Sequence, residues 1–158
     1  MQTITVPVAS LMEIVRLQLE TGGKANLAVT GSSMLPMLRQ GRDSVILVPA
    51  KEGLRVGDIA LYEPREGKYV LHRVMKLTPE GYLFCGDNQA VYEPVAREKI
   101  IARVDGYVRH GKQHSLSSFG YLLYKFIWVR LFFLRKYYIR LRRRLGRWRR
   151  ARSGRKVQ

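Results

Sequence analysis

The sequence holds few of the residues that cross-link small proteins or bind metal ions in them. It contains one cysteine, Cys85, among 158 residues, which excludes an intrachain disulfide and any metal site built from several cysteines. Cys85 follows an apolar run and is expected to be a small buried hydrophobic residue. The chain also contains three histidines, His72, His110 and His114, and neither a metal ion nor a cofactor is expected.

Two further absences concern apolar runs and acidic charge. The first residues lack a charged start followed by an apolar stretch, so neither a cleavable secretory signal nor an N-terminal membrane span is expected. Residues 106–158 contain 16 Lys and Arg and no acid, whereas residues 1–105 contain 13 Lys and Arg and 12 Asp and Glu. The net charge of +17 therefore belongs to the C-terminal third, where an anionic partner is expected.

The middle of the chain has the pattern of a compact β domain. Short runs rich in Val, Ile, Leu and Tyr, separated by Gly, Pro and Asp, predict strands at residues 27–30, 44–48, 58–62, 69–76, 82–85 and 100–107. No long helical pattern lies between them, which argues against parallel βαβ units. The sequence therefore predicts a mainly β fold, with a single β domain at residues 26–110.

The segments on either side of this domain differ in character. Ser10 and Glu13 fit a capping box and predict an amphipathic helix over residues 10–20, within an N-terminal helix and linker at residues 1–25. Residues 111–158 form a basic, aromatic segment that is expected to be a membrane-associated helix.

Residues 116–134 are the part of this segment that could enter a bilayer. Lys125 and Arg130 would each cost about 2.5 to 3.5 kcal/mol at the centre of a spanning helix, so an interfacial helix competes with a span. Aromatic residues mixed with long aliphatic ones are typical of the lipid headgroup zone. They are Tyr121, Tyr124, Trp128, Tyr137, Tyr138 and Trp148. Anionic lipid of the cell membrane is the expected partner, nucleic acid is the alternative, and the side of the membrane stays open.

Three side chains of the β domain could carry chemistry. Ser33 lies in the stretch TGSSMLP, at residues 30–36, but a serine hydroxyl needs a nearby base to become a nucleophile. His72 lies in a predicted strand, and alternation puts it on one apolar face with Val70 and Val74, which favours a neutral ring. Asp87 follows a strand and could orient that ring. A half-buried structural histidine and an ordinary Asp-Asn turn are the alternatives.

Short motifs containing these residues occur in the order found in a known family. They are Gly31-Ser32-Ser33-Met34-Leu35-Pro36, Gly41, Val56-Gly57-Asp58-Ile59, His72-Arg73-Val74 and Gly86-Asp87-Asn88. In this order and spacing they resemble the boxes of type I signal peptidases, a group of serine peptidases related to the self-cleaving repressors. The resemblance covers approximately residues 27–104.

The resemblance implies a serine endopeptidase that cleaves a precursor or secreted peptide, as in signal peptide processing. It implies that Ser33 is the nucleophile, with its backbone N–H stabilising the oxyanion, and that Asp87 belongs to the active site. His72 stands at the base position, as in the branch that replaces the usual bacterial lysine by histidine. Met34 and Leu35 are expected to contact the peptide or preprotein substrate.

The sequence also departs from the family pattern. Met37 stands where Ser or Thr usually follows the proline, and Gly31 offers no hydroxyl to the oxyanion. The usual N-terminal anchor is not expected, because the predicted helix over residues 10–20 takes its place ahead of the serine motif. Two other readings remain open. A non-catalytic, membrane-associated binding module could keep the fold, and a regulator of the self-cleaving repressor type would carry a helix-turn-helix ahead of the β domain and a lysine as base.

Overall fold

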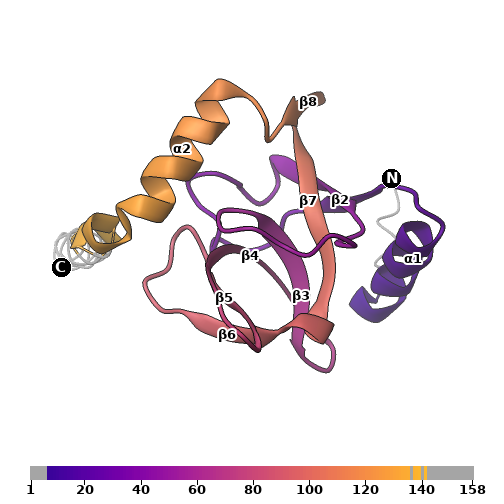
Figure 1. The fold of residues 1–158 in the computed structure, drawn as a ribbon. Helices are drawn as coiled ribbons and strands as arrows, with labels where there is room; N and C mark the ends of the chain where they lie inside the picture. Colours follow the sequence, from indigo (N-terminus) through magenta and orange to yellow (C-terminus); the bar gives the residue numbers. More distant parts are fainter. Residues whose placement is uncertain (1–6, 136, 140, 142–158) are drawn as a thin grey trace, which may run out of the picture.

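The computed structural model describes residues 7–135, 137–139 and 141. Its elements are α1 (Val8–Glu20), β1 (Ala25–Ala28), β2 (Asp43–Val48), β3 (Ile59–Arg65), β4 (Lys68–Leu77), β5 (Gly81–Cys85), β6 (Glu93–Ala96), the 3₁₀ turn η1 (Arg97–Lys99), β7 (Ile100–Arg109), β8 (Lys112–Ser115) and α2 (Phe119–Arg130). Figure 1 shows the strands between α1 on one side and α2 on the opposite side. The predicted mainly β fold with a short N-terminal helix is confirmed.

The strands of the described residues form one antiparallel sheet. Its order is β1-β2-β7-β3-β4-β5-β6, and β8 adds to β7. Because side chains alternate along a strand, β3 serves two cores. Ile59 and Leu61 belong to a larger core with α1, β2 and β7, and Ala60 and Tyr62 belong to a smaller one with β5 and β6. The sheet therefore has apolar packing on both faces of its central strand.

Helix α1 begins earlier than the sequence pattern indicates. The helix starts at Val8 after Pro7, whose carbonyl oxygen accepts the Leu11 N–H at 3.1 Å. Ser10 thus lies inside the helix, and the N-terminus has no side-chain cap, so the predicted capping box is wrong. The buried side chains of Met12, Val15 and Leu19 follow helical spacing, as expected for the face that packs on the sheet.

Two strands escaped the sequence pattern. Strand β6 pairs with β5 although it contains Pro94, and proline is unfavourable inside a sheet. The proline is tolerated because β6 is the last strand in the sheet order. Strand β8 has the polar sequence Lys-Gln-His-Ser and pairs with β7, which extends the sheet to Ser115. Neither segment has the alternating apolar residues that predict a strand.

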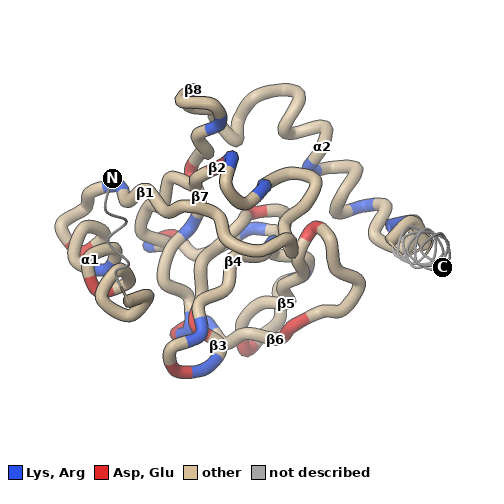
Figure 2. The backbone as a smooth tube through the Cα atoms, turned by 180° about the vertical axis from the view of Figure 1, so that it is seen from behind, with Lys and Arg blue, Asp and Glu red and all other residues tan. Residues whose placement is uncertain are grey.

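The C-terminal segment forms helix α2, and residues 132–135 and 137–139 are also helical. In Figure 2 the described part of this segment carries basic residues and no acidic ones. Among the described residues, no helix is long and apolar enough to cross a membrane.

Candidate active site

Ser33 lies in the irregular segment between β1 and β2 and is half-buried. The turn after β5 holds its backbone, because the Asn88 N–H donates to the Ser33 carbonyl oxygen at 2.7 Å and the Asn88 side-chain amide donates to the Ser32 carbonyl oxygen at 3.1 Å. Gly86 makes this approach possible, since a Cβ atom there would lie 2.7 Å from the Ser33 carbonyl oxygen. The Gly86-Asp87-Asn88 motif therefore positions the backbone of the candidate nucleophile.

His72 lies on β4 and is 6% exposed. Burial lowers the pKa of its ring from the usual value, the negative charges of Glu93 and Asp87 offset part of that effect, and the charge of Lys68 adds to it. A lowered pKa keeps the imidazole neutral near pH 7. The neutral ring is the form that a general base requires.

Ser33 and His72 line the same groove, which has a volume of about 690 Å³. Its walls come mainly from α1, the β1 region and the first half of β4. Among its apolar lining residues are Val8, Leu11, Leu27, Val29, Tyr69 and Leu71. Within the described part of the chain, no hydrogen bond joins the Ser33 hydroxyl to His72, so proton transfer requires the two groups to come together around a substrate.

The other ring nitrogen of His72 has a partner that the sequence did not indicate. His72 Nδ1 lies 3.0 Å from the hydroxyl oxygen of Tyr62, and this hydroxyl donates to Glu93 Oε2 at 2.6 Å. Glu93 Oε2 itself lies 3.8 Å from Nδ1. Tyr62 is completely buried, and its ring stacks on Phe84 with a centroid distance of 4.5 Å. The imidazole is therefore held from β3 and β6.

Asp87 lies elsewhere than the triad expectation requires. Its carboxylate accepts both Arg73 Nε and Arg73 Nη2, at 2.8 and 2.7 Å, and neither side chain is exposed. The Tyr124 hydroxyl donates to the same carboxylate at 2.9 Å. Among the described residues, no hydrogen bond joins Asp87 to His72, so the expected direct contact between Asp87 and the His72 ring is not formed. The negative charge still acts on His72 through space, as its effect on the His72 pKa indicates.

Of the two expected substrate-contact residues, Met34 and Leu35, only Met34 lines the groove. Met34 is 2% exposed and belongs to the larger core, and it also lines the groove. Leu35 is half-buried and does not line the groove. Among the described residues, the Ser33 N–H donates to no hydrogen-bond acceptor, and it is therefore available to an oxyanion.

Tyr62 and Glu93 are the site residues that sequence reasoning missed. A signal for Tyr62 existed, since the tight β3–β4 hairpin pairs Ala60 with His72, and strand alternation then places Tyr62 on the same face as His72. No local signal existed for Glu93. It reaches the site only because β6 pairs with β5, and the β6 sequence did not predict a strand.

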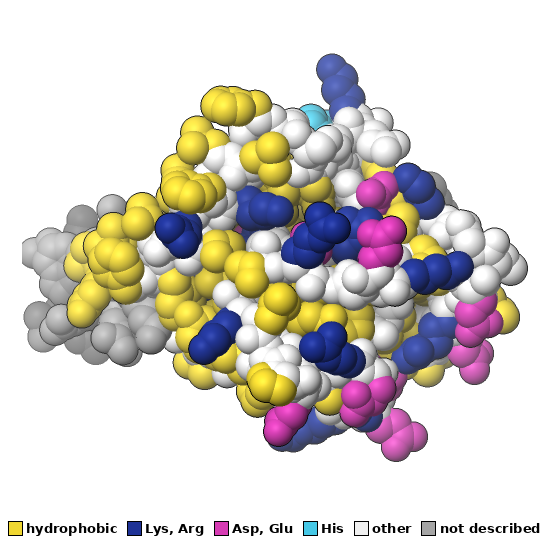
Figure 3. Space-filling model, in the orientation of Figure 1, with side chains coloured by type: hydrophobic (Ala, Val, Ile, Leu, Met, Phe, Trp, Pro, Cys, Tyr) yellow, Lys and Arg dark blue, Asp and Glu magenta, His cyan; other side chains and the backbone are white. Residues whose placement is uncertain are grey.

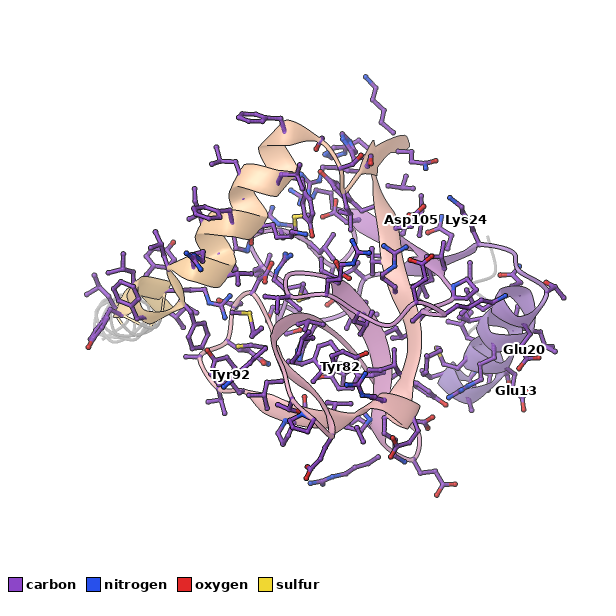
Figure 4. All side chains as sticks on the ribbon, viewed as in Figure 1. Glu13, Glu20, Lys24, Tyr82, Tyr92 and Asp105 are labelled. Atoms are coloured by element: carbon purple, nitrogen blue, oxygen red, sulfur yellow. The ribbon has the colours of Figure 1, made fainter. Side chains whose placement is uncertain are left out.

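Helix α2 packs against the domain through aromatic residues that the sequence pattern assigned to lipid headgroups. The Tyr121 hydroxyl accepts Arg73 Nη1 at 2.9 Å, and Trp128 Nε1 donates to the Asp87 carbonyl oxygen at 3.0 Å. Tyr92 lies against the end of the helical segment, where it stacks on Phe132 with a centroid distance of 4.7 Å (Figure 4).

These contacts correct the lipid assignment for part of the aromatic set. Tyr121, Tyr124 and Trp128 face the protein, because the two tyrosine hydroxyls bind the side chains of the buried ion pair and the indole N–H binds the Asp87 carbonyl oxygen. Tyr137 and Tyr138 are exposed, and Trp148 lies outside the described residues.

Within residues 7–135, 137–139 and 141, no three His, Cys, Asp or Glu side chains are grouped so that they could hold a metal ion. No model of a known protein family matches the chain, and no curated protein matches it either. The resemblance to type I signal peptidases therefore rests on the short motifs of the sequence and stays a prediction.

Proposed function

We propose that the protein is a serine endopeptidase of signal peptidase type, in which Ser33 is the nucleophile and His72 the general base. The observation that carries this proposal is the groove lined by both residues. They come from segments far apart in the sequence, the turn after β1 and the strand β4. Burial lowers the pKa of His72, which suits a base that works near neutral pH.

The reaction follows from these two side chains. His72 takes the hydroxyl proton of Ser33 at Nε2 while Ser33 Oγ attacks a peptide carbonyl carbon, and the resulting oxyanion accepts the Ser33 N–H. The imidazolium returns the proton to the leaving amine, which leaves an acyl-enzyme on Ser33. Water, activated by the neutral His72, then releases the acyl group as a carboxylic acid.

The edges of the groove suit a substrate in extended conformation. Strand β1 pairs with β2 on one side only, and β4 pairs with β5 only from Arg73 onward. The backbone of residues 68–72 therefore has a free edge beside the groove, as does β1. A peptide lying between these edges could add main-chain hydrogen bonds to either strand. The apolar lining favours apolar or small side chains in the substrate.

A fluorophosphonate probe tests this function without knowledge of the substrate, because it labels only activated serines. Wild-type protein should be labelled, Ser33→Ala should not, and Ser10→Ala, which changes an exposed serine on α1, should match the wild type. Labelling lost in Ser32→Ala but kept in Ser33→Ala would move the nucleophile to the neighbouring residue. Well-folded wild-type protein that resists the probe would favour the binding module, which would use the same groove.

We also propose that the enzyme works at an anionic membrane surface, which it contacts through the outward side of α2 and the helical residues that follow. Figure 3 shows hydrophobic side chains gathered along this side of the molecule. The exposed members are Phe119, Leu122, Leu123, Phe126, Ile127, Leu131, Phe133, Leu134, Tyr137, Tyr138 and Leu141. Soluble monomers rarely leave so continuous an apolar surface uncovered.

The charge of the segment indicates which partner covers this surface. Residues 106–158 carry 16 basic residues and no acid, so a second copy of the segment would be repelled, whereas anionic lipid would be attracted. Nucleic acid would satisfy the charge but not the aliphatic and aromatic side chains.

Vesicle flotation tests the membrane contact. The full chain should float with vesicles of phosphatidylglycerol and phosphatidylcholine, and the double variant Phe126→Glu with Phe133→Glu should not. Val91→Glu, which adds a charge at an exposed apolar residue outside the helix (76% exposed), is the control and should still float. A mobility shift with DNA at the same salt concentration, without flotation, would contradict this contact.

A further inference from the structure

The hydroxyl of Tyr62 determines which nitrogen of His72 carries a proton. A phenol has one hydrogen to donate, and an ionised carboxylate can only accept. The short distance of 2.6 Å to Glu93 Oε2 places that hydrogen on the bond to Glu93. The Tyr62 oxygen can then only accept from His72 Nδ1, 3.0 Å away, so Nδ1 carries the ring proton.

This assignment leaves the other nitrogen, Nε2, with a free lone pair. A general base needs such a lone pair, and a ring in the opposite tautomer would turn an N–H toward the groove instead. In the proposed reaction the Nδ1 proton stays on the ring. The Ser33 proton is added at Nε2 and later leaves with the amine, so the ring alternates between one proton and two.

Glu93 also stabilises the ring when it becomes charged. Its carboxylate oxygen lies 3.8 Å from Nδ1, close enough for a direct attraction to the imidazolium in a buried site. Tyr62 does not compete for the proton, because burial, followed by the hydrogen bond to Glu93, raises the pKa of the phenol far above its usual value. The phenol therefore bridges the two groups and does not act as an acid.

Asp87 acts on the His72 ring through its charge, but no hydrogen bond joins these two described residues. Arg73 binds both of its carboxylate oxygens, and Tyr124 donates to one of them. A motif-based assignment names Asp87 as the orienting carboxylate, whereas the hydrogen bonds of the ring run to β3 and β6.

We propose that Tyr62 and Glu93 are the positioning residues of the His72 base, which they hold as the Nδ1–H tautomer in place of a directly bonded aspartate. This inference rests on the proposed function for its catalytic meaning. The tautomer itself is a property of the folded protein and can be measured whether or not the protein is an enzyme.

The first measurement is long-range ¹H–¹⁵N NMR on the full chain labelled with ¹⁵N-histidine, in which His110→Gln and His114→Gln identify the His72 signals. At a pH where the ring is neutral, wild type should show a protonated Nδ1 and an unprotonated Nε2. Tyr62→Phe keeps the stacked ring and removes the bridge, and it should give a tautomer mixture. A wild-type ring protonated at Nε2, or an unchanged tautomer in Tyr62→Phe, would overturn the proposal.

The second measurement is the rate of fluorophosphonate labelling as a function of pH. Three charged groups act on the ring: Glu93 from β6, Asp87 from the turn after β5 and Lys68 from β4. Glu93→Gln removes one that raises the His72 pKa, so the rise of the rate with pH should move to lower pH. The plateau should fall by about tenfold, which is part of the 10²–10⁴ that general base catalysis contributes as a whole.

Two controls separate this proposal from a structural effect and from the proposed function. Glu98→Gln removes an exposed carboxylate on η1 and should leave rate and midpoint unchanged, and Glu93→Asp should restore part of the rate. An unchanged profile in Glu93→Gln, with labelling that still depends on Ser33, would refute the positioning role and leave the peptidase intact. Wild-type labelling that persists in Ser33→Ala would refute the peptidase, whereas the NMR result would stand.

Discussion

The carboxylates of Asp87 and Glu93 interact with neighbouring residues of β4, Arg73 and His72, in very different surroundings. Asp87 is completely buried and is held by Arg73, which is equally buried. The Glu93 side chain is 36% exposed, and its described partner is the hydroxyl that contacts His72. Burial alone would lower the pKa of Arg73, but the charge and hydrogen bonds of Asp87 raise it above the usual value. One carboxylate is thus committed to a cation, and the other remains available to a base.

The difference teaches that position in a motif does not determine the task of a side chain. The Gly86-Asp87-Asn88 motif contributes its backbone to the Ser33 turn and its carboxylate to the junction with α2. The residue that meets the imidazole through Tyr62 is Glu93, which comes from strand β6 and belongs to no motif. Substitutions at the two carboxylates should therefore affect stability and reactivity in opposite proportions.

The largest effect is expected from Asp87→Asn. The variant leaves the Arg73 guanidinium buried without a counter-charge, and loss of one partner of such a pair costs about 3–5 kcal/mol. Urea denaturation followed by circular dichroism measures the loss. Arg135 is also buried, with Nη1 3.8 Å from Asp87 Oδ1, so the triple variant Arg73→Met, Asp87→Leu and Arg135→Met removes all three charges and should recover much of the loss. An Asp87→Asn variant as stable as wild type would show that the pair contributes nothing to folding.

The next effect concerns acid stability and His72. Its pKa is lowered in the folded protein, so the unfolded chain binds more protons between the unfolded value of 6.5 and the folded value. Stability from this residue is present above pH 6.5 and is lost as the pH falls, by at most about 1.4 kcal/mol per unit. His72→Gln should flatten that slope in urea titrations. An equally steep slope in the variant would assign the acid sensitivity to other groups.

A smaller effect is expected from Tyr124→Phe. The phenylalanine keeps the packing of α2 and removes one hydrogen bond to Asp87, which should cost about 1 kcal/mol of unfolding free energy. The matched control is Tyr137→Phe, since the side chain of Tyr137 lies on the exposed side of the same segment. Equal stability of the two variants would mean that the Tyr124 hydroxyl does not support the ion pair.

The smallest effect on stability is expected from Glu93→Gln. Its side chain is 36% exposed, and the amide oxygen can still accept the Tyr62 hydroxyl, so the free energy of unfolding at pH 7 should change by no more than about 0.5 kcal/mol. Thermal melts of wild type and variant, made on the samples used for labelling, check this. A loss as large as that of Asp87→Asn would erase the distinction between the two carboxylates.

Much of the fold could be predicted because the central strands carry dense local signals. The apolar runs that became β2, β4 and β7 are bounded by turn residues, and the predicted ranges agree with the observed strands to within two residues at each end. Strands β6 and β8 could not be found this way. Their partners, and not their own residues, hold them in the sheet.

The candidate site also contains residues that local sequence could identify and residues that it could not. Ser33 and His72 were identified from sequence because each lies in a recognisable local context, and both line one groove. Their supporting residues depend on distances through space. The pairing of β6 with β5 brings in Glu93, and the docking of α2 turns Tyr121 and Tyr124 inward. Composition indicated instead that these tyrosines lie in the lipid headgroup zone.

The short turn after β5 contacts both helix α2 and the segment that contains Ser33. Trp128 of α2 donates a hydrogen bond to the backbone of this turn. Asn88 of the same turn donates hydrogen bonds to the carbonyl oxygens of Ser32 and Ser33. A displacement of α2 is therefore transmitted to the Ser33 hydroxyl through only a few covalent and hydrogen bonds. Ser33 and Trp128, almost a hundred positions apart in the sequence, are thus mechanically coupled through one turn.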